Sequence, residues 1–253
     1  MNRTVLITGA SSGIGAQLKK HFDECGDKVI NLSLNNPENP CDITKTEQLD
    51  KFFDGIKDEK LDILINCAGQ GLSGAVELVE EELIRKQFDI NFFGLVNVTK
   101  RALPLMKEKS KIINISSTCA LFPLPFRAYY CASKAAVSMI TDGLRMELKN
   151  TGIQVAAICP GEVKTNFTKN RVKEFKTNER YGDSVKNSTL YVDSHEDKRM
   201  SVEYAVKKMV KFIEKKKLKP QVIIGKQKML YFLKRLVPKS WFIGVTQKMF
   251  VKN

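Results

Sequence analysis

The stretch Thr4-Val5-Leu6-Ile7-Thr8-Gly9-Ala10-Ser11-Ser12-Gly13-Ile14-Gly15 decides the fold, because it joins a short apolar strand, a glycine-rich turn and, from about Ala16, a helix. Glycines let the backbone turn tightly and approach a pyrophosphate, whose charge is favoured by the free N–H groups and the dipole at a helix start. A simple turn is the alternative, and the spacing departs from the plain GxGxxG pattern. We predict a dinucleotide site with contacts from Gly9, Ser11, Ser12, Gly13, Ile14 and Gly15.

Short apolar runs recur along the rest of the chain and are separated by longer segments with helical spacing. The runs are too short for helices and do not alternate with polar residues, as expected of strands buried on both faces. Strands that alternate with helices predict an α/β fold, a doubly wound parallel sheet in one Rossmann-type domain over residues 1–253, with ligands at the carboxyl ends of the strands. The predicted strands are 5–7, 29–32, 63–65, 112–115, 155–158 and 222–224, and the clearest helical segments are 15–25, 80–107 and 132–149.

Two segments depart from this alternation. Residues 33–42 are polar and contain Pro37 and Pro40, so we expect the second crossover to be shortened and mostly irregular. Residues 165–201 are polar and charged, with isolated aromatic residues and only a weak helical period. This insertion is either a surface loop or a mobile lid over a substrate pocket.

Composition limits the classes of function. The 253 residues are 43% hydrophobic with a formal charge of +14, which favours an anionic partner such as a phosphorylated cofactor, an acidic lipid surface or nucleic acid. No apolar stretch approaches the ~20 residues that cross a bilayer. His21 and His195 are the only histidines, so we expect no metal site. Six separated cysteines and the absence of a signal-peptide pattern predict reduced thiols in a cytoplasmic protein.

Further polar motifs follow the glycine turn in order: Asn66-Cys67-Ala68-Gly69, Asn91, Ser117, Tyr130-Cys131-Ala132-Ser133-Lys134 and Pro160-Gly161. A tyrosine four residues before a lysine is weak evidence by itself, but the set in this order and spacing resembles the short-chain dehydrogenases/reductases over about residues 1–165. The resemblance implies a Rossmann-fold oxidoreductase that transfers hydride between NAD(P) and an alcohol/carbonyl pair. Its implied catalytic residues are Asn91, Ser117, Tyr130 and Lys134.

The pairing of Tyr130 with Lys134 has a chemical reason. A phenol has a pKa of about 10, so it needs a neighbouring cation before it can exchange a proton with a substrate oxygen near neutral pH. Residues i and i+4 share one face of a helix, which places Lys134 beside Tyr130. Tyr129 is five residues from Lys134 and points to another face, so we expect it to pack.

Ser117 and Asn91 complete the predicted proton-transfer site. Ser117 precedes Tyr130 by 13 positions, as in the family, and would hydrogen-bond the substrate oxygen while charge develops there. Ser116 points to the opposite side of a strand end and is the weaker candidate. The resemblance implies that Asn91 holds a water next to the lysine; a helix-interior role for Asn91 and a cap role for Ser117 are the alternatives.

The resemblance also implies the remaining cofactor contacts. The segment 66–69 would support the central sheet and the adenine ribose, with Cys67 in place of the usual second asparagine. Pro160-Gly161 and the residues after it would position the nicotinamide, and Asp42 would bind adenine unless it is merely solvated. The implied set is Asp42, Ile43, Asn66, Ala68, Gly69, Tyr130, Lys134, Pro160, Gly161, Val163 and Thr165.

The choice between NAD and NADP depends on the end of the second strand. An acid there would hold the ribose 2′-hydroxyl of NAD, and residues 31–36 contain none. Neither Ser12 nor Leu34 is the basic residue that usually binds a 2′-phosphate. Ser33 and Asn35 can donate hydrogen bonds to that group, so we predict NADP in preference to NAD, with Ser33 as a contact.

The C-terminal segment 226–253 mixes bulky apolar residues with lysines and arginines. It could wall the substrate pocket, pack at a subunit interface or lie in a membrane surface as a peripheral contact. We expect a homodimer or homotetramer. Leu121, Phe122, Leu124 and Phe126 predict a greasy rim and an apolar alcohol/carbonyl substrate such as a lipid or steroid.

Two other functions compete with the oxidoreductase. A catalytically idle dinucleotide sensor or scaffold usually loses the tyrosine or the lysine, and both are present in this chain. Nucleic-acid binding would need clustered basic residues with interleaved aromatic ones, whereas the basic residues are widely spread. We therefore predict no nucleic-acid partner.

Overall fold

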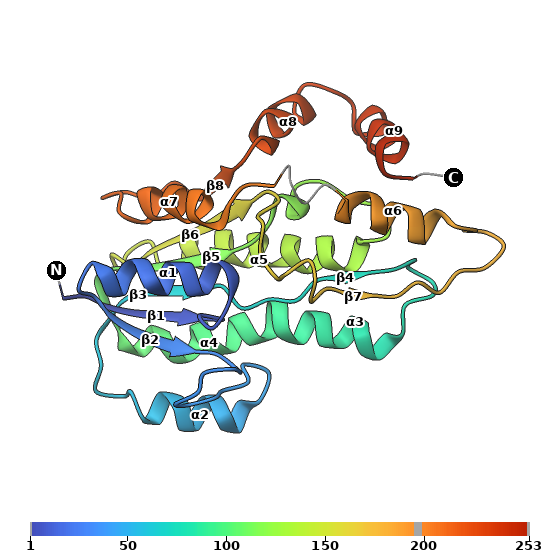
Figure 1. The fold of residues 1–253 in the computed structure, drawn as a ribbon. Coiled ribbons are helices and arrows are strands. Elements are labelled where there is room, and N and C mark those ends of the chain that lie inside the picture. Colours follow the sequence, from blue (N-terminus) through green and yellow to red (C-terminus); the bar gives the residue numbers. More distant parts are fainter. Residues whose placement is uncertain (1, 195–198, 252–253) are drawn as a thin grey trace.

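The computed structural model describes residues 2–194 and 199–251, so His195 lies outside the described residues. A parallel sheet of six strands forms the centre (Figure 1). Each predicted strand lies within one of these six, which confirms the predicted α/β class. In spatial order the strands are β2 (Lys28–Leu32), β1 (Thr4–Thr8), β3 (Leu61–Asn66), β5 (Met106–Ile115), β6 (Gln154–Pro160) and β8 (Gln221–Ile224).

Helices cover both faces of the sheet because successive strand residues point to opposite sides. Val5 and Ile7 pack with α1 (Gly13–Glu24) and α7 (Val202–Ile213), while Leu6 packs on the opposite face. That second face is covered by α2 (Thr46–Asp54), α4 (Leu95–Ala102) and the C-terminal part of α5 (Ala128–Glu147). The chain leaves β1 toward β2 and returns to β3 on the other side of β1, so the carboxyl ends of β1 and β3 mark the switch point where such sheets bind ligands.

The segment 80–107 is not the continuous helical segment that its spacing predicts. It consists of α3 (Glu81–Phe88), a π-helical turn η1 (Asp89–Gly94), α4 and a short 3₁₀ turn η2 (Leu103–Leu105), and β5 begins at Met106. Single π turns inside α-helices are often found at functional sites because they re-aim one side chain. Here the π turn contains Asn91.

The second crossover is irregular from residue 33 to residue 45, as the two prolines predict. It then forms the nine-residue helix α2, which the expectation of a mostly irregular connection did not include. Leu49, Phe52 and Phe53 of this helix are buried, so packing on the sheet stabilises a helix that begins only after the prolines.

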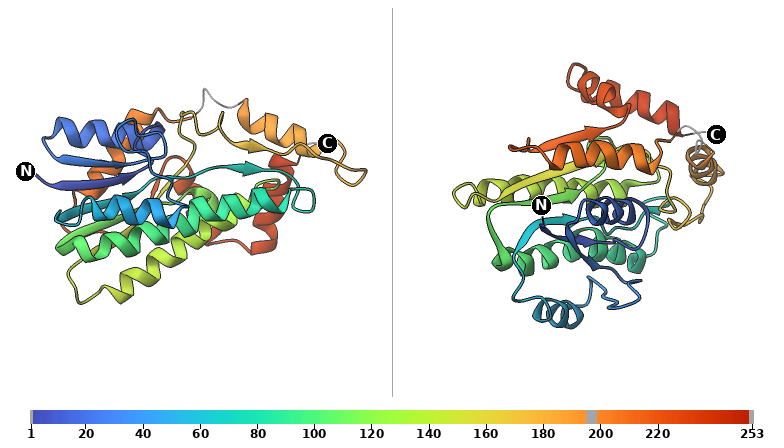
Figure 2. Two further views of the ribbon diagram at one scale, coloured as in Figure 1. Left: turned by 90° about the horizontal axis from the view of Figure 1, so that it is seen from below. Right: turned by 60° about the vertical axis from the view of Figure 1, so that its left-hand side comes forward.

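The two segments outside the alternating pattern both lie beyond the sheet. The insertion pairs β7 (Val172–Lys173) with β4 (Leu72–Ser73) and continues into α6 (Ser184–Asp193). The C-terminal segment forms α8 (Gln227–Lys234) and α9 (Lys239–Phe250), which stand outside the layers that flank the sheet (Figures 1 and 2). Across residues 2–194 and 199–251, every helix is too short or too polar to cross a membrane.

Candidate active site

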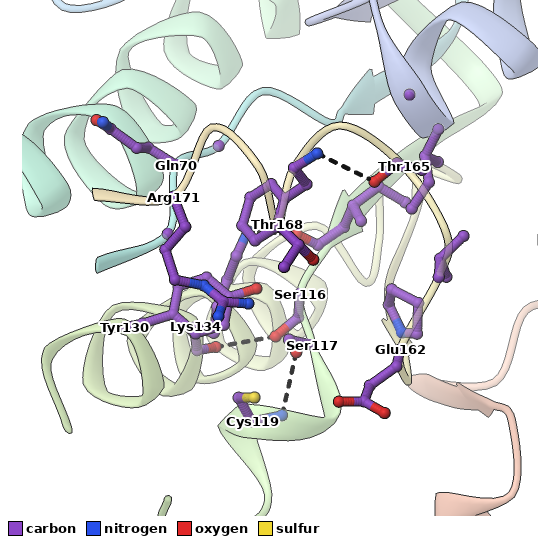
Figure 3. Close-up of a pocket in the computed structure, with 18 of the residues that line it drawn as sticks. Gln70, Ser116, Ser117, Cys119, Tyr130, Lys134, Glu162, Thr165, Thr168 and Arg171 are labelled. Atoms are coloured by element: carbon purple, nitrogen blue, oxygen red, sulfur yellow. Dashed lines mark hydrogen bonds between the residues drawn. The ribbon is translucent and has the colours of Figure 1, made fainter. Parts of the chain in front are cut away.

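A cavity of about 740 Å³ opens at the carboxyl ends of β1, β3, β5 and β6. Its wall has two parts of different construction. The turn side consists of Gly9 and residues 11–15, 32–35, 41–43 and 67–71, which are strand ends and glycine-rich turns. The insertion side consists of Phe122, Leu124 and Arg127 with lining residues from the insertion and from α8 and α9; Leu121 and Phe126 of the predicted greasy rim do not line the cavity. The polar residues Ser117, Tyr130 and Lys134 lie where the two sides meet (Figure 3).

Tyr130 and Lys134 occupy successive turns near the start of α5, and Ser117 follows the end of β5. The Lys134 ammonium donates a hydrogen bond to the Ile115 carbonyl at 2.9 Å and is only 5% exposed. The Ser117 hydroxyl interacts with the phenol of Tyr130 and also accepts a hydrogen bond from the Cys119 N–H at 3.1 Å. The structure therefore brings these three side chains together as the sequence predicts.

The neighbouring alternatives make hydrogen bonds to other groups. Tyr129 donates its hydroxyl hydrogen to the Val76 carbonyl at 2.8 Å and does not line the cavity. Ser116 lines the cavity, but its hydroxyl donates to the Lys134 carbonyl at 2.9 Å and lies 2.9 Å from the Ser138 hydroxyl, so it connects β5 to α5. Ser117 is the hydroxyl that interacts with the Tyr130 phenol.

Burial shifts the pKa of both titratable groups in the site. The phenol of Tyr130 has its pKa raised by burial and by the nearby Cys119 thiol, while Ser117 and the Arg171 guanidinium act in the opposite direction. Burial lowers the pKa of Lys134 from 10.5 to about 8. The phenol is therefore neutral and carries a proton that it can donate. The cation that lowers its pKa in this structure is Arg171, and not Lys134 as the sequence predicts, because the Lys134 ammonium is bound to the Ile115 carbonyl.

Asn91 lies behind this site, outside the cavity wall. Its amide oxygen accepts from the Gln70 N–H at 2.8 Å, and its amide nitrogen donates to the Gln70 carbonyl and the Ser133 hydroxyl. A side chain at Gly69 would place its Cβ 3.2 Å from the Asn91 amide oxygen and 3.4 Å from the Lys134 ammonium. Asn91 therefore fixes the 69–71 loop within a short distance of Lys134.

The glycine turn has the geometry that a dinucleotide requires. Gly9 and Gly13 have φ values of +69° and +54°, which favour glycine. A Cβ on Gly15 would lie 2.3 Å from the Gly9 carbonyl oxygen, and one on Gly9 would lie 2.9 Å from the Ala68 Cα. Because α1 begins at Gly13 with no acid in its first turn, its N-terminal N–H groups suit a pyrophosphate.

The predicted cofactor contacts line the cavity with the exception of Asn66. The Asn66 amide is buried between strands and donates to the Thr99 hydroxyl at 3.0 Å and to the Asn114 amide oxygen at 2.8 Å. Its position therefore fits support of the central sheet and not a cofactor contact. Asp42 lines the cavity and accepts hydrogen bonds from the Thr44 N–H and hydroxyl, which form a turn that orients its carboxylate.

Comparison with known proteins identifies the family. The family model described as short chain dehydrogenase matches residues 3–176. The chain belongs to this family. A probable short-chain type dehydrogenase/reductase of Helicobacter pylori is 35% identical over 94% of each chain, and a 3-ketodihydrosphingosine reductase of Bacteroides thetaiotaomicron is 37% identical over 76% of each. A solved short-chain dehydrogenase from Streptomyces avermitilis, 25% identical, matches 98% of this chain and 96% of its own with a TM-score of 0.84.

Family membership makes the chain a short-chain dehydrogenase/reductase, an NAD(P)-dependent oxidoreductase that acts on CH–OH groups. The glycine turn and the strand ends described above are where this fold holds a nicotinamide dinucleotide, and the free helix N-terminus with its close glycine contacts fits that group. When bound, the nicotinamide supplies or accepts a hydride.

The insertion side of this short-chain dehydrogenase combines aromatic side chains with three arginines, Arg127, Arg171 and Arg199. The Phe167 ring lies 5.8 Å from the Tyr130 ring, and Phe122 from the predicted greasy rim stacks on Phe242 of α9 at 5.6 Å. The insertion and the C-terminal helices also meet, since Tyr191 of α6 and Phe250 of α9 are 6.2 Å apart. Of the roles left open for residues 226–253, the structure shows that of a pocket wall.

Among the lining residues that the motifs did not predict, Cys119, Arg127 and Arg171 are those that act on the polar groups of the site. The Arg171 guanidinium lowers the pKa of the Tyr130 phenol. The pKa of the Cys119 thiol is lowered mainly by a hydrogen bond with Cys131, and both arginines lower it further. Arg171 belongs to the insertion, and no spacing or periodicity relates it to Tyr130. Only the chain path that carries the insertion over α5 brings the two together.

Proposed function

We propose that this short-chain dehydrogenase/reductase interconverts an apolar carbonyl compound and its alcohol with NADP(H), and that Tyr130 is its acid/base. The observation that carries the proposal is the meeting of Ser117, Tyr130 and Lys134 at the junction of the turn side with the insertion side. An amphipathic cavity of this kind binds the reacting carbonyl next to polar groups and its apolar remainder against aromatic side chains.

In the reductive direction Tyr130 donates its phenolic proton to the substrate oxygen while the carbonyl carbon receives the hydride. Ser117 donates a hydrogen bond to the same oxygen, which stabilises the negative charge that develops there. Lys134 would also hold the nicotinamide ribose of a bound cofactor, and its ammonium, four residues along the same helix, would stabilise the phenolate left on Tyr130. In oxidation the same groups run in reverse, with Tyr130 accepting the proton of the alcohol.

Asn91 supports this chemistry through Lys134. The hydrogen bonds from Asn91 to Gln70 and Ser133 hold the loop that faces the Lys134 ammonium. We propose that this rigid frame positions a water next to Lys134, through which the proton lost by Tyr130 is replaced from solvent.

NADP is the proposed cofactor because no acid stands where it would bind a ribose 2′-hydroxyl. Ser33, Leu34 and Asn35 line the turn side at this point. The Ser33 hydroxyl donates to the Asn31 amide oxygen, so in this structure the exposed Asn35 amide is the group free to donate to a 2′-phosphate, and Ser33 can donate to it only by turning away from Asn31. The net charge of +14 favours the more anionic dinucleotide.

The insertion is proposed to act as the substrate lid. Residues 165–168, Asn170 and Arg171, with Tyr191 and Val192 of α6, line the cavity from outside the sheet. A two-residue pairing between β7 and β4 is the sheet contact that holds the insertion at its start. A segment attached in this way can open and close over a bulky substrate without disturbing the core.

A second proposal concerns the outer face of α8 and α9, which we propose contacts an anionic membrane surface. Apolar side chains are exposed there, including Met229 at 78%, Leu236 at 82% and Trp241 at 52%. The exposed cations Lys226, Lys228, Arg235, Lys239 and Lys248 lie on the same segment. Apolar residues mixed with cations are the composition that binds an anionic bilayer from one side, and the same helices wall the cavity.

Vesicle co-sedimentation tests the membrane proposal. Vesicles containing 30% anionic lipid, about the level that gives an appreciable negative surface potential, are expected to retain the wild type, and neutral vesicles are not. Leu236→Glu should abolish retention, and Met139→Glu, at an exposed apolar position on α5, serves as the control. The predicted homodimer or homotetramer is measured by analytical ultracentrifugation of the same samples; an oligomer that Leu236→Glu dissociates would assign this face to self-association instead.

The oxidoreductase proposal is tested by following NADPH absorbance with a carbonyl panel that runs from short sugars to long-chain ketones and steroids. Bulky apolar carbonyls are expected to be reduced best. Binding of NADPH without turnover of any member would contradict the proposal and support a dinucleotide-binding scaffold.

A further inference from the structure

Arg127 stands at an electrostatically unfavourable position. It is the residue that precedes the first turn of the 20-residue helix α5, where the helix dipole disfavours a cation, and the first turn contains no acid. Phe126 directly before it adopts a left-handed φ of +57°, which is strained for a phenylalanine and turns the chain into this position. Arg127 is only 8% exposed.

The guanidinium of Arg127 is also incompletely paired. Its Nη2 atom is buried and has no hydrogen-bond partner among residues 2–194 and 199–251. A buried cation without an anionic or polar partner is costly, so such groups are retained where a ligand completes them. Arg127 lines the cavity, which is the space from which a partner can reach it.

Arg171 approaches the same part of the cavity from the insertion. Its side chain is 9% exposed and, among the residues that the structure describes, its ion pair is with Asp193 at 3.3 Å. Asp193 is shared with Lys173 at 2.7 Å, so a single carboxylate serves two cations. Burial and the positive charge of Arg127 lower the pKa of Arg171 to about 10, which reflects the shortage of negative charge around this pair.

This surplus of positive charge lies beside the reacting phenol. Figure 3 shows the Arg171 side chain extending toward Tyr130 and Lys134. The positive charges of Arg171 and Arg127 both lower the pKa of the Cys119 thiol, and Cys119 is two residues from Ser117. The third arginine in the wall, Arg199, is occupied by hydrogen bonds to the Thr168 hydroxyl and the Val192 carbonyl.

We infer that Arg127 and Arg171 bind an oxyanionic group of the substrate, a carboxylate or a phosphate, close to the carbonyl that Tyr130 protonates. The inference rests on the proposed function, because it names the substrate class of the same site. A planar guanidinium forms paired, charge-assisted hydrogen bonds with either oxyanion, and the helix N-terminus beneath Arg127 adds to the attraction. The aromatic insertion side takes the apolar remainder, so the substrate class is an amphipathic acid.

Binding of short amphiphiles tests this inference without any turnover. Decanoate, decyl phosphate and methyl decanoate are titrated, below their aggregation concentrations, into the full chain by calorimetry with NADP⁺ saturating, so that the glycine turn is blocked. One or both anions should bind at least about tenfold more tightly than the ester, because the charge-assisted hydrogen bonds require the oxyanion. The stronger anion identifies whether the natural group is a carboxylate or a phosphate.

Variants locate the binding group. Arg127→Met and Arg171→Met should each weaken the preferred anion by about ten- to hundredfold and leave the ester unchanged. Arg171→Lys should recover part of the loss. Arg85→Ala, on the exposed face of α3 where Arg85 pairs with Glu81, is the control for loss of a positive charge and should bind like the wild type.

The inference is contradicted if the wild type binds the anions and the ester with equal affinity, or binds none of them measurably. This outcome does not depend on whether any variant folds. Wild-type affinity in both methionine variants would contradict it as well. Tyr130→Phe should bind the anion normally. If Tyr130→Phe binds the anion normally and the wild type turns over no member of the carbonyl panel, the anion site is supported and the proposed reaction is contradicted.

Discussion

At the β1–α1 turn the cavity wall is backbone, since Gly15 approaches Gly9, and Gly9 approaches Ala68, too closely for side chains. Across the cavity, Phe122, Arg127 and Arg171 present side chains from loops and from the insertion. The turn side takes a ligand common to the whole family through N–H groups and close contacts. The insertion side presents charged and aromatic side chains, and we propose that selection among carbonyl compounds takes place there. In this proposal the chain holds the cofactor with backbone and chooses the substrate with side chains.

The largest expected effect comes from filling the backbone wall. A Cβ at Gly15 would lie 2.3 Å from the Gly9 carbonyl oxygen and 2.8 Å from its carbon, and neither atom can move aside as a side chain would. Gly15→Ala should lower the affinity for NADPH and NADH at least about hundredfold and destabilise the fold by about 2 kcal/mol. Cofactor fluorescence titration and urea unfolding measure the two effects.

Gly143→Ala is the matched control for that substitution. A Cβ at Gly143 meets no described atom within 4 Å, and the residue lies inside α5. Alanine there should stabilise the fold by up to about 1 kcal/mol and leave cofactor affinity unchanged. If Gly15→Ala binds the cofactor normally, close backbone contacts at the glycine turn are not required for binding, and the proposed difference between the two sides of the cavity is wrong.

On the insertion side the wall consists of side chains, so the substitution that tests it removes one: Phe242→Ala. Phe242 is 4% exposed, stacks on Phe122 and lines the cavity. Its loss should cost about 3 kcal/mol of unfolding free energy and raise KM for apolar carbonyls with little change in cofactor affinity. Ile243→Ala, the exposed neighbour on α9, should stay within about 0.5 kcal/mol in urea unfolding. A loss of cofactor binding in Phe242→Ala would show that the two sides are coupled.

Lys134, at the junction of the two sides, should give the stability a characteristic pH dependence. Burial lowers its pKa to about 8, so above that pH the folded chain releases a proton that the unfolded chain, with a lysine pKa near 10.5, retains. The contribution of Lys134 to stability therefore rises with pH through this window, by about 2 kcal/mol from about pH 7.5 to about pH 9.5. Buried thiols such as Cys67 and Cys159, whose pKa values burial raises, act in the opposite direction, so the contribution of Lys134 is measured as a difference between the wild type and a variant that lacks it.

Urea unfolding of the wild type and of Lys134→Met across that pH range measures this contribution. The variant should lack the rise, so the difference between the two proteins should change by about 2 kcal/mol. Parallel curves would mean that Lys134 is not a buried cation, and the electrostatic account of the junction would need revision.

The smallest effect is expected for the choice of cofactor on the turn side. Ser33→Asp places a carboxylate where it can bind a ribose 2′-hydroxyl and repel a 2′-phosphate, so the NADP/NAD ratio of kcat/KM should fall by about tenfold. Asn36→Asp adds the same charge three positions away, outside the cavity lining, and should change the ratio less. An unchanged ratio in Ser33→Asp would remove Ser33 from the cofactor site.

The sequence predicts the sheet well because strands buried on both faces appear as continuous apolar runs, such as Leu64 between Ile63 and Ile65. The junction residues are predicted from the resemblance to the family, and the local geometry of one helix accounts only for the pairing of Tyr130 with Lys134. The π turn at Asn91 escaped prediction because its residues have ordinary helical spacing. The helix α2 escaped because its packing, and not its propensity, stabilises it.

Other features depend on contacts between distant segments, which local patterns do not encode. Asn66 follows an apolar strand just as a ligand-binding residue would, and only the neighbouring Asn114 and Thr99 turn its amide inward. Arg127 and Arg171 are ordinary charged residues in the sequence, and they form a pair only because the insertion folds back over α5. The insertion side is therefore known only from the fold.

The most direct test of the central claim compares Tyr130→Phe with Tyr129→Phe, using NADPH and the best carbonyl from the panel. Tyr130→Phe should lower kcat about a thousandfold or more while the Kd for NADPH stays within about threefold, because the phenol donates the proton and contributes little to binding the dinucleotide. Tyr129→Phe should remain close to wild type, since Tyr129 bonds the Val76 carbonyl away from the cavity. Turnover retained by Tyr130→Phe, or lost by Tyr129→Phe, would contradict the assignment.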